Sequence, residues 1–317
     1  MNNLKKIGLS ALAGSLVATS AFAGEMSVSG GASINVEHTN GGAADTGKTF
    51  SMGNQLTFSG GGELDNGLSV SLSFVLDQGD DATDGIGNAP FDSHSVTVSS
   101  DSLGSLKFSG EGGSSAVSAL DTTAGGDIWD SFDDADAIKP TGVGGGNNSM
   151  MYTLPSMVDG LSISAGYTPA GTGTDSATSY SATYSGVEGL SVSYGVGEDT
   201  SVGNAGEGTA LKASYAYGPV TVGYSSYEFD TTGTASDDDT TGYSVSYTVS
   251  DELSVTYASE EVTRPGKQDA EFSSISAAYT VGGMTISAAM QDAENIDGTT
   301  TATEDRERWA LGLSFAF

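Results

Sequence analysis

A two-residue period in hydrophobicity is the feature of this sequence that most constrains its fold. Within residues 68–74, Leu68, Val70, Leu72 and Phe74 alternate with three serines. The same alternation recurs from residue 25 to the C-terminus, and helical spacing is not sustained anywhere. Because successive side chains of a β-strand point to opposite faces, the pattern predicts strands with one apolar face and one polar face.

The alternation divides the chain into about sixteen strand segments. They lie near residues 25–38, 48–60, 67–77, 91–100, 104–111, 148–155, 161–169, 178–186, 190–198, 209–217, 220–229, 241–249, 253–261, 271–280, 284–292 and 305–317. In the segment 220–229, Tyr227 and Phe229 are out of phase with Val220 and Val222. This departure favours a bulge, or a strand that runs into its loop.

The connectors between these segments are alternately short and long, and the long ones are acidic and rich in Gly and Thr. An even number of strands joined in this way is typical of an all-β, up-and-down antiparallel barrel of an outer membrane. With about sixteen strands, such a barrel is too wide to be filled by side chains and encloses an aqueous channel.

Composition favours this barrel over a soluble β-protein. The chain has 46 glycines and a mean hydropathy of −0.13, and the second faces of its segments are mostly Ser, Thr, Gly and Ala. A soluble β-sandwich would need bulky residues on those faces. A solenoid would show a fixed repeat, which we do not find, and a disordered chain would not sustain the alternation.

The N-terminus is typical of an export signal. Lys5 and Lys6 precede a short apolar stretch, and Ala21-Phe22-Ala23 offers the small residues of a cleavage site. We therefore expect residues 1–23 to be removed and residues 24–317 to form the barrel; a retained N-terminal anchor is the alternative. The mature chain would carry 8 basic and 41 acidic residues, a net charge of −33. That charge disfavours a nucleic-acid partner and favours cations.

One connector, residues 109–147, is much longer than the others. Loops of this length are usually functional or disordered. We expect a short helix at residues 114–120, followed by an acidic stretch around residues 127–136 and a glycine triplet at residues 144–146.

The residues on either side of this loop resemble the general porins of Gram-negative bacteria, especially those of α-proteobacterial type. The C-terminal Leu-Gly-Leu-Ser-Phe-Ala-Phe at 311–317 is similar to the barrel-assembly signal of outer-membrane proteins. The resemblance to the porins is carried by Leu-Gly-Ser-Leu-Lys-Phe at 103–108 and by Asn-Ser-Met-Met-Tyr-Thr-Leu-Pro at 148–155, followed by Asp-Gly-Leu at 159–161. It implies a homotrimer of sixteen-stranded barrels in the outer membrane, each narrowed by its third loop and surrounded by lipid and lipopolysaccharide. It also implies that Phe317 is the terminal residue of a barrel-assembly signal.

The resemblance makes residues 109–147 the constriction loop, whose acidic residues would line the pore. These are Glu111, Asp121, Asp127, Asp130, Asp133, Asp134 and Asp136. Family members set a basic cluster against this loop, but this chain has few basic residues and carries Asn147-Asn148 where an Arg is common. A strong transverse field is therefore in doubt.

Strand phase directs a few basic residues into the lumen, because a charge facing lipid would cost about 2–4 kcal/mol at mid-membrane. The candidate basic residues of the pore wall are Lys107, Lys212, Arg306 and Arg308. Arg264 and Lys267 fall in a loop and are expected to be ordinary surface charges.

The expected function is passive diffusion of ions and small hydrophilic solutes through a cation-preferring pore. Enzymatic activity is not expected, because there is no cysteine and because His38 and His94 lie at the ends of separate strands. No cofactor is expected. Acidic residues near the second long loop are candidates for loose Ca²⁺ binding: Asp77, Asp80, Asp81 and Asp84. A solvated acidic loop is the alternative to Ca²⁺ binding there. The alternatives are a substrate-selective barrel and a plugged structural or adhesive barrel.

Overall fold

The structure is a computed structural model that describes residues 26–41, 47–77, 92–132, 143–170, 176–200, 205–231, 237–299 and 305–317. The predicted cleavage site lies outside these residues, so removal of residues 1–23 remains a prediction.

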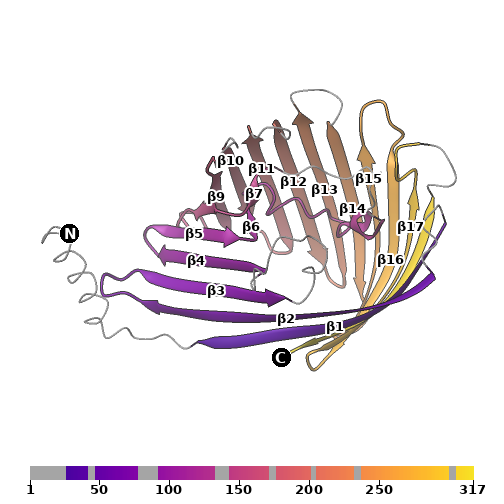
Figure 1. The fold of residues 1–317 in the computed structure, drawn as a ribbon, viewed down its shortest axis with the longest axis horizontal. Coiled ribbons are helices and arrows are strands. Elements are labelled where there is room, and N and C mark those ends of the chain that lie inside the picture. The colour runs from indigo at the N-terminus through magenta and orange to yellow at the C-terminus, as the bar shows by residue number, and fades with distance from the viewer. Residues whose placement is uncertain are drawn as a thin grey trace, which may run out of the picture.

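Sixteen antiparallel strands form one closed barrel (Figure 1). Strands that are neighbours in the sequence are neighbours in the barrel, and β1 pairs with β18 to close it. The barrel strands are β1 (Ser27–Asn40), β2 (Gly47–Glu63), β3 (Ser69–Asp77), β4 (Ser93–Ser100), β5 (Gly104–Glu111), β8 (Ser149–Thr153), β9 (Leu161–Thr168), β10 (Ala177–Tyr184), β11 (Leu190–Asp199), β12 (Gly206–Tyr217), β13 (Val220–Thr231), β14 (Asp238–Thr248), β15 (Leu253–Thr263), β16 (Ala270–Val281), β17 (Met284–Glu294) and β18 (Arg306–Ala316). The predicted all-β barrel is confirmed, and each predicted segment is one of its strands.

The connection between β5 and β8 holds three further short elements. These are the two-residue strands β6 (Gly113–Ser114) and β7 (Gly145–Gly146) and the 3₁₀ helix η1 (Ile128–Phe132). The helix predicted at residues 114–120 is wrong, because residues 116–120 form a turn. Ser115 and Ser118 bond to each other's backbone N–H groups at 2.6 and 2.9 Å, and such bonds compete with a helical ladder.

The two faces of each strand differ as the alternation predicts. On β15, Val255 and Tyr257 are exposed on the outer face, whereas Ala258 and Glu260 are buried on the inner face. Tyrosines at the short-turn ends of the strands are also exposed, where an aromatic girdle would meet the membrane interface. They include Tyr184, Tyr217, Tyr247 and Tyr279. The outer surface is thus the apolar one, as a lipid-facing surface must be.

The segment 220–229 has neither a bulge nor a strand that runs into its loop, so both predictions for it are wrong. β13 pairs with β12 and with β14 in unbroken register over its length. Tyr227 and Phe229 are instead buried on the inward face, at 3% and 0% exposure. Their phase differs from that of Val222 because they point into the barrel.

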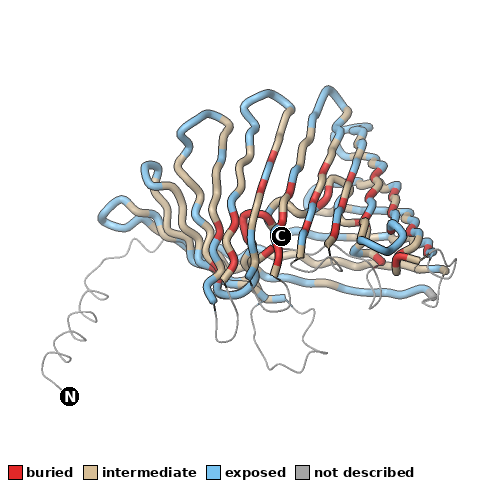
Figure 2. The backbone as a smooth tube through the Cα atoms, turned by 90° about the horizontal axis from the view of Figure 1, so that it is seen from above, coloured by how far each residue is buried: buried red, intermediate tan, exposed pale blue. Residues whose placement is uncertain are grey.

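Short turns lie at one end of the barrel and long connections at the other. One turn, Gly282-Gly283 between β16 and β17, has φ values of 56° and 83°. Positive φ at both central residues gives the turn a twist that matches the flanking strands, and glycine adopts it without steric cost. Figure 2 shows that these turns are exposed, whereas buried residues concentrate toward the other end of the barrel.

Candidate functional site: the loop inside the barrel

We call residues 112–148, which connect β5 to β8, the inner loop; its described residues, 112–132 and 143–148, fold into the barrel. Its two ends pair with each other, Gly113 with Gly146 and Ser114 with Gly145. From this base the inner loop crosses the interior toward β16 and β17 (Figure 1). Glu111, predicted in the loop, is the last residue of β5, opposite His94 of β4.

Serine hydroxyls on the barrel wall hold the backbone of the inner loop. Ser179 Oγ on β10 accepts a hydrogen bond from Ala116 N at 2.8 Å. Ser225 Oγ on β13 accepts one from Ala124 N, also at 2.8 Å. Both serines are buried, so these bonds satisfy loop N–H groups that water does not reach.

The first part of the inner loop packs on an apolar surface of the barrel wall. Val117 and Leu120 pack against Ala210 of β12 and Tyr227 of β13. A Cβ added at Gly195 of β11 would lie 3.1 Å from Leu120 Cδ1, so a glycine leaves space for the leucine. The packing of Tyr227 against Val117 and Leu120 explains why this aromatic residue of β13 faces inward.

The returning part of the inner loop uses a second glycine. A Cβ at Gly208 of β12 would lie 2.2 Å from Val143 Cγ2 and 3.5 Å from the Phe229 ring. Val143 and Phe229 are both fully buried. The out-of-phase Phe229 is therefore also part of the wall that supports the loop.

Helix η1 forms the far end of the described loop and packs on the wall opposite β5. Ile128 and Phe132 are buried, and the rings of Phe132 and Phe272 are 6.1 Å apart. Trp129 packs against the same cluster. The wall residues of this cluster are Ala258, Val262, Ala270, Phe272, Ala293 and Ile296.

Three of the predicted loop carboxylates lie in the described part of the inner loop. Asp121 and Asp127 are half-buried and Asp130 is exposed. Asp127 Oδ1 accepts a hydrogen bond from Thr123 N at 2.8 Å. Asp133, Asp134 and Asp136 lie outside the described residues, and so does Lys139.

Asp121 is the loop carboxylate whose ionisation the surroundings change most clearly. Burial, aided by the negative charge of Asp127, raises the pKa of the Asp121 carboxyl to about 6. The Lys212 ammonium opposes this rise. The Asp121 carboxyl therefore changes its charge as the pH passes through about 6.

Two of the four predicted wall cations contact the inner loop. Lys212 Nζ donates to Thr122 O at 2.5 Å. Arg308 donates to Ser131 Oγ at 3.4 Å and forms an ion pair with Glu37 of β1. Both side chains point into the barrel, as their strand phase predicts, and both are engaged by the loop or by the wall.

The other basic residues are distributed differently. Lys107 is half-buried on the inward phase of β5, and Arg306 is 8% exposed at the start of β18. The expectation for Arg264 is wrong: its Nε lies 2.6 Å from Oδ1 of Asp238, whose side chain is fully buried. Burial of the carboxylate makes this a structural ion pair rather than an ordinary surface charge.

Glu260 of β15 is a contact residue that the sequence analysis missed. Its carboxylate accepts hydrogen bonds from Thr123 Oγ1 and, at 3.1 Å, from Trp129 N. The sequence does contain a signal for this contact residue. Glu260 has the same strand phase as Thr256 and Ala258, opposite to that of Val255. The parity argument that selected the wall cations would have placed it in the lumen too.

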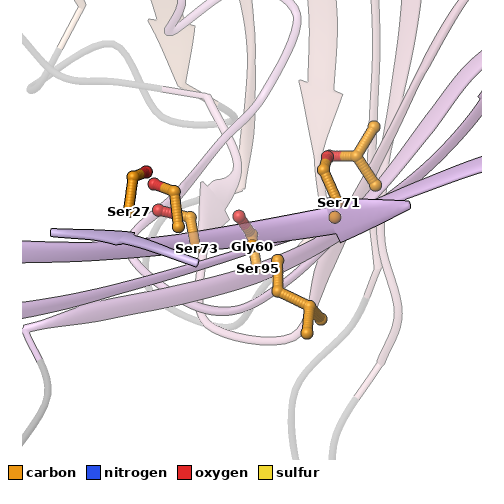
Figure 3. Close-up of a pocket in the computed structure, with 9 residues that line it drawn as sticks. Ser27, Gly60, Ser71, Ser73 and Ser95 are labelled. Carbon is orange, nitrogen blue, oxygen red and sulfur yellow. The ribbon is translucent and has the colours of Figure 1, made fainter. Parts of the chain in front are cut away.

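The part of the wall formed by β1–β4 is lined by hydroxyl groups. A hollow of about 360 Å³ lies on it (Figure 3). Its lining has no charged residue and consists of Ser27, Ser59, Gly60, Gly61, Ser71, Leu72, Ser73, Ser95 and Thr97. We call the surface formed by these nine residues the serine wall.

A comparison with protein families gives one decisive match. The profile described as Gram-negative porin matches residues 8–280, which is most of the chain. The chain belongs to the Gram-negative porin family. A comparison with curated protein sequences finds no match.

Solved structures similar to this porin agree with its fold. A variant of the Rhodobacter blastica porin has a TM-score of 0.68 at 15% identity, over 92% of this chain and 100% of that one. The anion-selective porin from Comamonas acidovorans has a TM-score of 0.67 at 18% identity, over 92% of this chain and 99% of that one. Membership of the Gram-negative porin family also places this porin in the bacterial outer membrane.

Two further observations concern the described residues of this porin. They contain no helix long and apolar enough to cross a membrane. They also contain no group of three or more acidic or histidine side chains arranged to hold a metal ion. Asp77 ends β3, but Asp80, Asp81 and Asp84 lie outside the described residues, so loose Ca²⁺ binding there remains a prediction.

Proposed function

We propose that this porin is a water-filled, cation-preferring channel for passive diffusion of ions and small hydrophilic solutes. Membership of the porin family supports the outer-membrane channel itself. The preference for cations is supported by one observation: the inner loop brings Asp121, Asp127 and Asp130 inside the barrel. Among the described residues, Lys212 and Arg308 are cations that contact the loop, and they are bonded to Thr122 and Glu37.

The fold does not determine the sign of this selectivity, since one similar barrel belongs to an anion-selective porin. Selectivity depends on the charges along the pore. In a narrow lumen with low-dielectric walls, fixed carboxylates concentrate cations and exclude anions. The serine wall adds no positive charge to oppose the loop.

The proposal includes assembly as a homotrimer surrounded by outer-membrane lipid and lipopolysaccharide. The apolar outer surface supports contact with lipid, and the family resemblance supports the trimer. Light scattering in mild detergent tests the trimer directly. We expect the mass of three chains, and a monomer would contradict this part of the proposal.

The decisive experiment for the channel is a planar-bilayer recording across a KCl gradient. We expect a reversal potential of cation-selective sign that weakens at high salt, because the Debye length is only about 3 Å at 1 M. An anion-selective reversal potential would overturn the cation preference. The absence of current would favour the plugged structural or adhesive barrel. Saturable block by one class of solute would favour the substrate-selective barrel.

A further inference from the structure

Glu260 is a buried carboxylate that takes its hydrogen bonds from the inner loop. It is 1% exposed, and no basic side chain among the described residues forms an ion pair with it. Oε1 accepts from Thr123 Oγ1, and Oε2 accepts from Trp129 N at 3.1 Å. A buried carboxylate is stable only when such bonds replace its water. The wall and the loop therefore stabilise each other at this residue.

The two partners of Glu260 can only donate to it. Thr123 Oγ1 already accepts from Gly126 N at 3.1 Å and from Asp127 N at 3.0 Å, so its single proton is directed to Glu260. Trp129 contributes a backbone N–H, which is a donor as well. Residue 260 therefore needs a hydrogen-bond acceptor at each of the two terminal atoms of its side chain. A carboxylate supplies them, whereas an amide does not.

The segment that Glu260 holds carries the loop carboxylates. Thr123 N donates to Asp127 Oδ1 at 2.8 Å, which closes a compact turn in which Asp127 adopts a φ of +58°. Asp121 lies two residues before this turn, and Asp130 follows Trp129 in η1. The hydrogen bonds to Glu260 therefore locate the acidic segment against the wall on both sides of Asp127.

We propose that Glu260 is the positioning residue of the constriction, which places Asp121, Asp127 and Asp130 where they set the charge of the pore. The inference rests on the proposed function, in that the inner loop borders the conducting path. Loss of the carboxylate releases the turn at Thr123 and allows the acidic segment to move away from its place. Cation selectivity then falls although every loop carboxylate is still present.

The first test compares Glu260→Gln with Glu261→Gln. The two residues are adjacent, and each substitution replaces a carboxyl group with an amide. Glu261, however, is exposed on the outer face. We expect Glu260→Gln to lower the cation-to-anion permeability ratio about two-fold or more and to increase open-channel noise, while Glu261→Gln keeps the wild-type ratio. Equal ratios in the two variants would overturn the proposal.

A cross-link distinguishes positioning from the charge of Glu260 itself. A Cβ at Gly223 of β13 would lie 3.3 Å from Ala124 Cβ, close to the roughly 3.8 Å typical of disulfides. The native chain has no cysteine, so the Ala124→Cys, Gly223→Cys pair is free of side reactions. In the Glu260→Gln background, we expect the oxidised pair to restore the wild-type ratio and reduction to abolish the rescue. A cross-linked protein that keeps the lowered ratio would show that Glu260 acts through its charge, which overturns the proposal.

Gly125→Ala tests the same contact from the side of the loop. A Cβ at Gly125 would lie 2.5 Å from Glu260 Oε1, so alanine forces the turn and the carboxylate apart. The wall is unchanged in this variant, which keeps the test valid where Glu260→Gln impairs barrel assembly. We expect a lowered ratio, and a wild-type ratio would contradict the proposal. Failure of the proposed function would instead be visible in the wild type, as anion selectivity or absent current.

Discussion

The guanidinium of Arg308 on β18 binds the carboxylate of Glu37 on β1, across the seam where the barrel closes. The same guanidinium donates to Ser131 Oγ at the end of η1 and to Gln291 Oε1 on β17. One side chain thus joins the first strand, the last strand and the inner loop. Its positive charge is balanced by Glu37, so it does not act as a free cation in the lumen.

This pairing predicts opposite effects of two substitutions. Arg308→Gln leaves Glu37 as an unbalanced carboxylate and should raise the cation-to-anion permeability ratio. Glu37→Gln leaves Arg308 unbalanced and should lower it. The double variant should lie near the wild type, since each single change removes one half of a balanced pair. Reversal potentials of the four proteins measure this cycle. Changes of the same sign in both single variants would contradict it.

The pKa of Asp121 predicts a pH dependence of selectivity. Because this pKa is raised to about 6, the carboxyl loses its charge as the pH falls through about 6. We expect the cation preference of the wild type to decrease between about pH 7 and pH 5, and Asp121→Asn to lack this part of the decrease. Reversal potentials measured at a series of pH values test it. An identical pH profile in the variant would show that Asp121 does not act on the pore.

The raised pKa of Asp121 also predicts how firmly the inner loop packs on the wall at different pH values. A carboxyl with a raised folded-state pKa stabilises the folded state fully below its unfolded value of 3.8. That contribution is lost as the pH rises to about 6. Open-channel noise from loop motion should therefore increase over this range in the wild type and not in Asp121→Asn. A profile that falls with pH would contradict the assignment.

Neutralisation of the acidic stretch tests the inner loop as a whole. We expect Asp127→Asn, Asp130→Asn, Asp133→Asn and Asp134→Asn together to reduce the cation-to-anion permeability ratio while the barrel stays folded. Exposed turn residues provide the control, because Asp101→Asn with Asp251→Asn removes charge outside the lumen. The control should keep the wild-type ratio. An unchanged ratio in the loop variant would show that these carboxylates do not border the pore.

The glycines beneath the inner loop predict a packing effect. Gly208→Ala places a methyl group against Val143, and overpacking of this kind costs roughly 1–3 kcal/mol. Gly60→Ala is the matched control, since a Cβ there meets nothing within 4 Å. We expect a lower urea midpoint and noisier current only for Gly208→Ala. Equal behaviour of the two variants would mean that Val143 does not rest on β12.

The strands, their two faces and the inward direction of Lys212 and Arg308 could all be predicted from the sequence. These properties follow from a local rule, because side chains of a strand alternate and the membrane penalises a charge on the lipid face. The resemblance of residues 103–108 and 148–155 to porins was also sufficient to identify the family.

The contacts between inward-facing residues could not be predicted in this way, because they depend on how the folded chain brings distant segments together. Tyr227 and Phe229 looked like a defect of the alternation because the feature that explains them, the inner loop, lies about a hundred residues earlier in the chain. The bond between Glu260 and Thr123 spans 137 residues in the same way. The two-residue period predicts that such side chains face inward. Their partners depend on the path of the loop, and that path exists only once the barrel has closed around it.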